Sequence, residues 1–138
     1  MAVEPSQAVD TKIQTLSNVL REEGYLPKVD NDGDIAFKAQ GHRVILFGDN
    51  EDPQYVRMAC ILDVESKPAA KCLQAANKVS KGLKVIKAVV VNETTVFVSA
   101  EFFFDNVEQL GPVFPRTIDA LLSGVQRFWT ELEKMSAD

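Results

Sequence analysis

The stretch that decides the fold is Leu83–Phe104, which reads LKVIKAVVVNETTVFVSAEFFF. Valine, threonine and phenylalanine dominate both halves, and these side chains favour a pleated, half-buried strand. Asn92 and Glu93 interrupt the run at its middle, where a short turn would reverse the chain. We therefore predict a hairpin of two antiparallel strands, Leu83–Val91 and Thr94–Phe104.

An amphipathic helix is predicted before this hairpin, over about Gln7–Glu23. The residues expected on its buried face recur every three or four positions: Val9, Ile13, Leu16 and Leu20. Lys12 falls among the polar residues, which we expect on the opposite, solvent-facing side. Gly24 follows the last turn, and glycine adopts the left-handed conformation of a helix cap without strain.

Two more helices are predicted, one on each side of the hairpin. The first covers Lys67–Lys81 and has Ser66 as its expected N-cap. After the hairpin, Asp105 and Glu108 have the spacing of a capping box. Two prolines interrupt the start of the last apolar helical pattern, so we expect a break there and a continuous helix from about Phe114.

Short apolar runs separated by turn residues lie between the first two helices. The runs are Ile35–Ala39, His42–Phe47 and Tyr55–Val64, and their short connections predict an antiparallel meander. The sequence leaves open whether Tyr25–Val29, which contains a proline, joins the sheet. The expected fold is a single α+β domain over residues 1–138, with the order helix, strand meander, helix, hairpin, helix.

Composition excludes several classes of function. The 138 residues carry a net charge of -5, with a sequence pI of about 4.9. Nucleic acids and anionic membrane surfaces both require clustered lysine and arginine, so we expect neither as a partner. No apolar segment is long enough to span a bilayer. Cys60 and Cys72 lack C-x-x-C spacing, which favours two buried, reduced thiols and a cytoplasmic protein.

The residues whose side chains could act in catalysis or bind a metal do not form a recognised pattern. Asp30–Asp34 reads DNDGD, but a calcium loop with Gly33 in sixth place would begin at Lys28 and end at Ala39. Both of those positions should be acidic, so we interpret the segment as a hairpin turn. His42 is the only histidine and cannot build a zinc site alone. We predict no metal, no cofactor, no catalytic residues and no enzymatic activity.

Alternation along the strands gives the strongest pointer to function, because successive side chains point to opposite faces. One set is predicted to be core: Val56, Met58, Cys60, Leu62, Val96, Val98, Ala100, Phe102 and Phe104. The opposite set is mixed but includes four large apolar residues: Tyr55, Ile61, Phe97 and Phe103. In the first hairpin strand, Val85, Val89 and Val91 are expected on one side. Large exposed apolar patches are rare on monomers, so we favour a partner or a homodimer over helices covering both faces.

The order of segments resembles the fold of the class I type III secretion chaperones. Within that fold it is most similar to the YbjN-like family, described as sensory transduction regulators, and to related cyanobacterial domains. The motifs that carry the resemblance are Gly24-Tyr25, Asp32–Lys38, Asp52–Arg57 and Ser99–Phe102. They cover nearly the whole chain. The resemblance implies a small, acidic, cytoplasmic protein, usually dimeric, that binds other polypeptides without catalysis or a cofactor.

We predict a non-enzymatic protein-binding domain, chaperone-like or regulatory, that acts through its apolar sheet surface. The predicted contact residues are Tyr55, Ile61, Phe97 and Phe103. The partner is an unidentified protein, and a homodimer is expected. The alternative is a small-molecule sensor domain with a pocket between the sheet and the C-terminal helix, near Phe114 and Trp129. An enzyme of unrecognised type would need polar residues that converge in one cleft.

Overall fold

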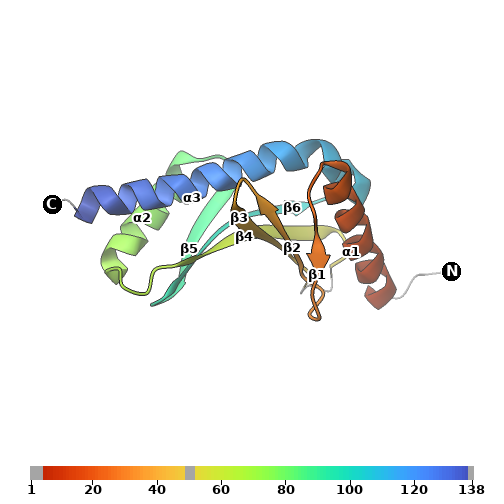
Figure 1. Cartoon of the computed structure of the whole chain (residues 1–138), viewed down its shortest axis with the longest axis horizontal. Helices are drawn as coiled ribbons and strands as arrows, with labels where there is room; N and C mark the ends of the chain where they lie inside the picture. The colour runs from red at the N-terminus through yellow and green to blue at the C-terminus, as the bar shows by residue number, and fades with distance from the viewer. Residues whose placement is uncertain (1–4, 49–51, 137–138) are drawn as a thin grey trace. The chain divides into compact units, whose positions relative to one another are not determined.

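The computed structural model describes residues 5–48 and 52–136, and it has an α+β fold with a six-stranded antiparallel sheet (Figure 1). In chain order the elements are α1 (Pro5–Glu22), β1 (Lys28–Val29), β2 (Ile35–Ala39), β3 (His42–Phe47), β4 (Tyr55–Asp63), α2 (Ala69–Gly82), β5 (Ile86–Asn92), β6 (Thr95–Phe103), the 3₁₀ helix η1 (Val107–Val113) and α3 (Phe114–Ser136). The strands lie in the order β1-β2-β3-β4-β6-β5. The predicted fold class and segment order are confirmed.

Two compact units make up the chain. The first comprises Met1–Met58 and Glu101–Arg116, and the second comprises Ala59–Ala100 and Thr117–Asp138. The chain passes from one unit to the other inside β4, β6 and α3. The single domain expected over residues 1–138 stays a prediction.

The strands of the first unit follow the sequence pattern closely. Both β2 and β3 have the predicted bounds, and a two-residue loop joins them. Gln40 and Gly41 in that loop have φ angles of 51° and 83°, as tight hairpin turns require. The open question about Tyr25–Val29 is answered in part, because Lys28 and Val29 pair with β2 as a short edge strand. The sequence also predicts a turn over Gly48–Pro53, between β3 and β4, and residues 49–51 of it lie outside the described part.

In helix α1 the predicted buried face is confirmed at two positions, Ile13 is only half-buried, and one other position contradicts the prediction. Leu16 and Leu20 are fully buried, and α1 packs against η1. The side chain of Val9 lies outside the described part. Lys12 was expected to face solvent, but only 2% of it is exposed. The expectation was wrong because Lys12 lies four residues before Leu16, on the same helix face, and its ammonium group finds backbone acceptors there.

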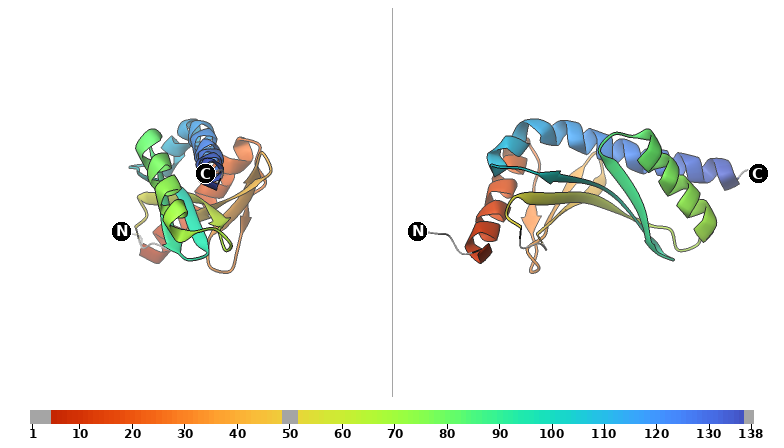
Figure 2. Two further views of the ribbon diagram at one scale, coloured as in Figure 1. Left: turned by 90° about the vertical axis from the view of Figure 1, so that its left-hand side faces the viewer. Right: turned by 180° about the vertical axis from the view of Figure 1, so that it is seen from behind.

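The second unit contains the hairpin and α2, which runs alongside β5 (Figure 2). The hairpin strands are shorter than predicted, and their turn lies one residue later, at Glu93 and Thr94. Val85, Val89 and Val91, expected on one side, are all exposed, whereas Ile86 of the opposite set is buried. Val85 precedes β5 with a φ of 73°, and Val91 lies at a register shift. Only Val89 remains in regular alternation.

Helix ends differ from the predicted caps by one or two residues. Pro68 occupies the N-cap of α2 without a side-chain hydrogen bond, so Ser66 is not the cap. Asn106 and Gln109 form the capping box of η1, one residue after the predicted Asp105 and Glu108. The continuous helix α3 begins at Phe114, as predicted.

The buried set predicted from alternation forms the core face of β4 and β6. Most members are buried: Val56, Met58, Cys60, Leu62, Val96, Val98 and Ala100. Phe102 and Phe104, at the end of the hairpin, are only half-buried. The two cysteines are buried and unpaired, and burial raises the pKa of the Cys60 thiol to about 11. Both thiols are therefore protonated and inert near neutral pH, as expected for core residues.

Candidate protein-binding surface

The first part of the candidate surface lies in the first unit, on the face of β4 and β6 opposite to the core. The rings of Tyr55 and Phe103 lie 5.9 Å apart between centroids, and 83% of Phe103 is exposed. The Tyr55 hydroxyl donates a hydrogen bond of 2.6 Å to Oε2 of Glu101. We call Tyr55, Glu101 and Phe103 the aromatic cluster. Glu101 is exposed, and as a hydrogen-bond acceptor it orients Tyr55.

Lys12 fixes the backbone that carries the aromatic cluster. Its Nζ donates hydrogen bonds to the carbonyl oxygens of Tyr55, at 2.9 Å, and of Asp52, at 3.1 Å. At the same end of the strand pair, the Phe104 amide donates to the Gln54 carbonyl at 3.0 Å. Charge-assisted bonds are stronger than neutral ones. The start of β4 is therefore held in place by a side chain from α1.

The second part of the surface lies in the second unit. The register of β5 and β6 places Val89 directly opposite Phe97. The Val64 amide donates to the Thr94 carbonyl at 2.8 Å, and three residues further into each antiparallel strand Ile61 comes opposite Phe97. Ile61 is 45% exposed, Val89 is 41% exposed and Phe97 is half-buried. We call Ile61, Val89 and Phe97 the apolar strip.

The edge of the sheet beside the apolar strip is partly covered. Strand β5 is last in the strand order, and unpaired edge strands invite added strands. Ser80 of α2 accepts a hydrogen bond of 2.9 Å from the Ala88 amide and is 3.4 Å from the Ala88 carbonyl oxygen, to which its hydroxyl donates. A strand added at Ala88 would have to break both contacts. At this point the outer face of the sheet is therefore more accessible to a partner than the edge is.

The four predicted contact residues thus fall into two pairs. Tyr55 and Phe103 lie together in the first unit, and Ile61 and Phe97 lie together in the second. Their binding role stays a prediction. Residue alternation already indicated Val89, which completes the apolar strip but was not among the four. No comparable sequence pattern indicates the hydrogen bond between Tyr55 and Glu101, because it joins residues far apart in the chain.

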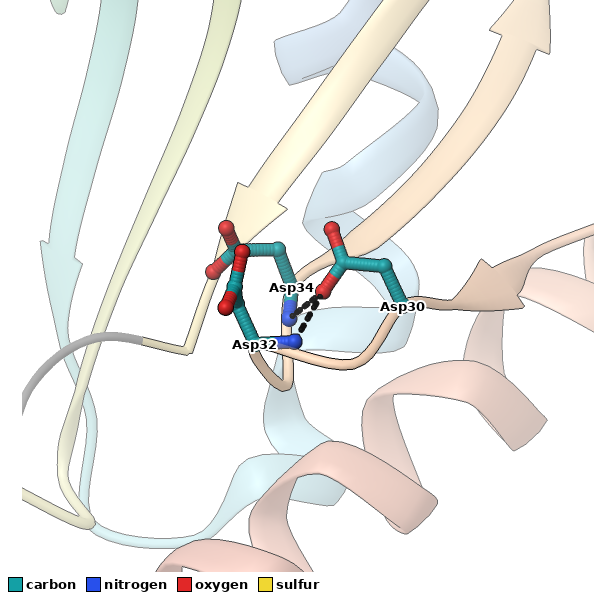
Figure 3. Close-up of side chains that lie close together, drawn as sticks. All are labelled: Asp30, Asp32 and Asp34. Atoms are coloured by element: carbon teal, nitrogen blue, oxygen red, sulfur yellow. Dashed lines mark hydrogen bonds between the residues drawn. The ribbon is translucent and has the colours of Figure 1, made fainter.

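Three aspartates of the turn between β1 and β2 also lie together (Figure 3). One carboxylate oxygen from each of Asp30, Asp32 and Asp34 lies within 4.8 Å of the others. Oδ1 of Asp30 accepts hydrogen bonds from the amides of Asp32, at 2.9 Å, and Asp34, at 3.0 Å. Oδ1 of Asp34 accepts another from the Gly48 amide, at 2.8 Å. These contacts are those of an aspartate-stabilised turn, which agrees with the predicted hairpin connection.

The residues of the alternative sensor pocket have the environment of core residues. Phe114 is fully buried in the first unit. Trp129, in the second unit, is half-buried, and its ring meets Phe128 edge-on with 5.2 Å between centroids. A ligand pocket beside these two residues stays a prediction. Among residues 5–48 and 52–136, every helix is too short or too polar to cross a membrane.

Comparisons with known proteins support the fold. No protein-family model and no curated protein matches the sequence. The structure is similar to that of an uncharacterized protein from Methanothermobacter thermautotrophicus, with a TM-score of 0.61, 16% identity and coverage of 89% of this chain and 98% of that one. It is also similar to YbjN from E. coli, a proposed transcription regulator, with a TM-score of 0.59, 11% identity and coverage of 91% and 92%. Identities this low show the fold alone, and the chain has a YbjN-like fold.

Proposed function

We propose that the protein is a non-enzymatic protein-binding domain, chaperone-like or regulatory, that holds another polypeptide on the outer face of β4, β6 and β5. The apolar strip is the observation that carries this proposal. Ile61, Phe97 and Val89 come from three neighbouring strands and present apolar side chains side by side. Burial of such side chains against a partner is favourable in proportion to the apolar area removed from water.

The first occupant that we propose for the strip is a second copy of the chain. An uncharged apolar strip is self-complementary, and a two-fold dimer brings the same patch of both copies together. The aromatic cluster supplies a second contact surface, because Phe103 is the most exposed aromatic side chain of the described residues. A different protein with an extended apolar segment is the alternative occupant, which the second experiment below addresses.

Solution mass, measured by light scattering after size exclusion over a range of concentrations, tests the dimer. The wild type should reach twice its monomer mass of 15.3 kDa. The double variant Ile61→Ser/Val89→Ser should stay monomeric, and it avoids the half-buried Phe97. Leu73→Ser is the matched control, because Leu73 is an exposed leucine on α2 in the same unit and the variant should dimerise normally. A wild type that is monomeric at every concentration would reject the dimer.

Binding of an unfolded polypeptide tests the protein-binding proposal apart from the dimer. A fluorescently labelled, reduced and carboxymethylated model polypeptide would be titrated with the wild type, the strip double variant and Phe103→Ser. Fluorescence anisotropy should rise with the wild type and less with the strip variant, while circular dichroism confirms that each variant is folded. If neither self-association nor polypeptide binding depends on the strip residues, the proposed function is wrong.

Binding rather than catalysis is favoured by how the chemically active groups are engaged. Glu101 accepts a hydrogen bond from Tyr55, the carboxylate of Asp30 accepts two backbone amides of its own turn, and the carboxylate of Asp34 accepts the Gly48 amide. The proposal therefore assigns no catalytic residue and no cofactor. It places the protein in the cytoplasm, where unpaired thiols such as Cys60 and Cys72 stay reduced.

A further inference from the structure

A hollow of about 420 Å³ lies in the first unit beside β1 and β2. Three apolar residues and three cations are prominent in its lining: Tyr25, Leu26, Phe37, Lys28, Lys38 and Arg43. Pockets that hold small molecules usually measure about 300–1,000 Å³, so the hollow is large enough for a compact ligand. It is distinct from the aromatic cluster and the apolar strip.

The hollow forms because β1 is too short to cover β2. The two strands pair only where Lys28 meets Ala36 and Val29 meets Ile35, and the preceding segment diverges from β2 (Figure 1). The Asp30 amide bonds to the Asp34 carbonyl, so by alternation the backbone groups of Ala36 and Lys38 point to the same side. At Lys38, β1 has already ended. The backbone of β2 therefore faces the hollow at this point.

The hollow has an apolar wall, and cations surround this wall. The half-buried ring of Tyr25 and the side chain of Leu26, which is 86% exposed, form an apolar wall. The Tyr25 ring packs on Phe37, with 5.0 Å between centroids, and Phe37 itself is a core residue with 3% exposed. Lys28, Lys38 and Arg43 surround this wall, and within the described chain no acidic residue lines the hollow. The local charge is therefore opposite in sign to the net charge of -5.

Among the described residues, no acidic side chain compensates the three cations. Lys38 and Arg43 lie directly opposite each other on β2 and β3. Like charges at such a pair are destabilising, because the two side chains are close on one face of the sheet. Within residues 5–48 and 52–136, no ion pair or side-chain hydrogen bond engages Lys28, Lys38 or Arg43. An anion held between them would remove the repulsion.

We propose that this hollow binds a small apolar carboxylate, such as a medium-chain fatty acid. The aliphatic chain lies against Tyr25 and Leu26, and the carboxylate accepts hydrogen bonds from Lys38 and Arg43. Arginine and lysine form charge-assisted hydrogen bonds with carboxylates, and the apolar wall excludes water from one side of them. The preference for a carboxylate over an alcohol of equal length follows from the two opposed cations.

Titration of the ¹⁵N-labelled full chain with octanoate, followed by amide chemical shifts, tests the proposal. Saturable shifts should appear at Leu26, Phe37, Lys38 and Arg43. The double variant Lys38→Gln/Arg43→Gln should weaken octanoate binding about tenfold, which corresponds to about 1.4 kcal/mol. 1-Octanol should bind the wild type more weakly than octanoate does. Lys81→Gln/Lys84→Gln is the matched control, because it removes two lysines from the second unit and should bind octanoate normally.

A thermal unfolding experiment gives a second readout that does not depend on the shifts. Without ligand, Lys38→Gln/Arg43→Gln should unfold at the same temperature as the wild type or higher, because the repulsion between the two cations is gone. At equal concentration, octanoate should raise the unfolding temperature of the wild type more than that of the variant, which binds it more weakly. The proposal is overturned if octanoate shifts only the apolar strip, if 1-octanol binds equally well, or if the double variant binds like the wild type.

Discussion

A single buried lysine shows how one residue decides the local structure. Lys12 lies on an amphipathic helix, and its Nζ replaces water with the carbonyl oxygens of Asp52 and Tyr55. Buried charges are stable only when such partners are present. The sequence marks Lys12 as polar and therefore predicts exposure. Its spacing from Leu16 was a signal of burial, but the acceptors lie about forty residues away, and no local pattern reveals them.

Lys12→Met should destabilise the protein by about 2 kcal/mol, because two charged hydrogen bonds are lost while the aliphatic stem is kept. Urea unfolding followed by circular dichroism measures the change. Gln14→Met, at an exposed position of the same helix, is the control and should change the free energy of unfolding by less than about 0.5 kcal/mol. Equal losses in both variants would mean that the Lys12 contacts do not contribute to stability.

Glu131 links two helices of the second unit. It is 7% exposed on α3, and its carboxylate lies 3.2 Å from Nζ of Lys78 on α2. Arg127 and Lys134, on its own helix, lie 3.4 Å and 3.7 Å away. The hydrogen bond from Lys78 holds the pKa of Glu131 below its ordinary value, burial opposes this effect, and the charges of Lys134 and Lys78 add to it. The ion pair therefore joins α2 to α3 in its ionised form.

Replacement of Glu131 by glutamine should reduce the acid sensitivity of the fold. A carboxyl whose folded pKa is depressed contributes stability above its unfolded pKa, and this contribution is lost as the pH falls through the folded pKa. The difference in urea midpoint between wild type and Glu131→Gln should therefore be largest near pH 7 and shrink below the ordinary carboxyl value of 4.5. Glu133→Gln, an exposed neighbour on α3, should follow the wild type. A constant difference across this range would contradict the linkage.

Element boundaries were predictable where a local pattern decides them. Alternation and the Gln40-Gly41 turn define β2 and β3, and the two prolines place the start of α3 at Phe114. Caps were less predictable, since Asp105 and Asn106 are both good N-cap residues and the choice depends on which backbone amides are left unpaired. The positive φ of Val85 was unpredictable, because β-branched residues rarely adopt it.

On the scale of the whole molecule, alternation predicted which residues share a face of the sheet. It did not predict which distant segments of the chain come to lie side by side. The core set and the apolar strip both follow from the period of a strand. The hollow does not, because Lys28, Lys38 and Arg43 come together only through the register of three strands. Its volume depends further on where β1 ends, which no residue pattern specifies.

The chain passes back and forth between the two units, and this connection should make their unfolding cooperative. The chain crosses between the two units at Met58-Ala59, Ala100-Glu101 and Arg116-Thr117. Each crossing lies inside a regular element, namely β4, β6 or α3. Unfolding of one unit therefore frees the end of a strand or helix that continues into the other. We expect one cooperative transition, as small single domains usually show.

Lys12→Met, a change in the first unit, should therefore also shift the unfolding transition that is measured in the second unit. Trp129 is the only tryptophan and lies in the second unit, so its fluorescence reports on that unit. In urea unfolding of Lys12→Met, the midpoint measured by Trp129 fluorescence should fall by the same amount as the midpoint measured by circular dichroism. Gly124→Ala is the reciprocal variant, because its Cβ would lie 2.9 Å from Ile86 Cγ2 and 3.0 Å from Val98 Cγ1 on stiff β-branched side chains. If Lys12→Met leaves the Trp129 midpoint unchanged while circular dichroism splits into two steps, the units unfold independently and the single domain is wrong.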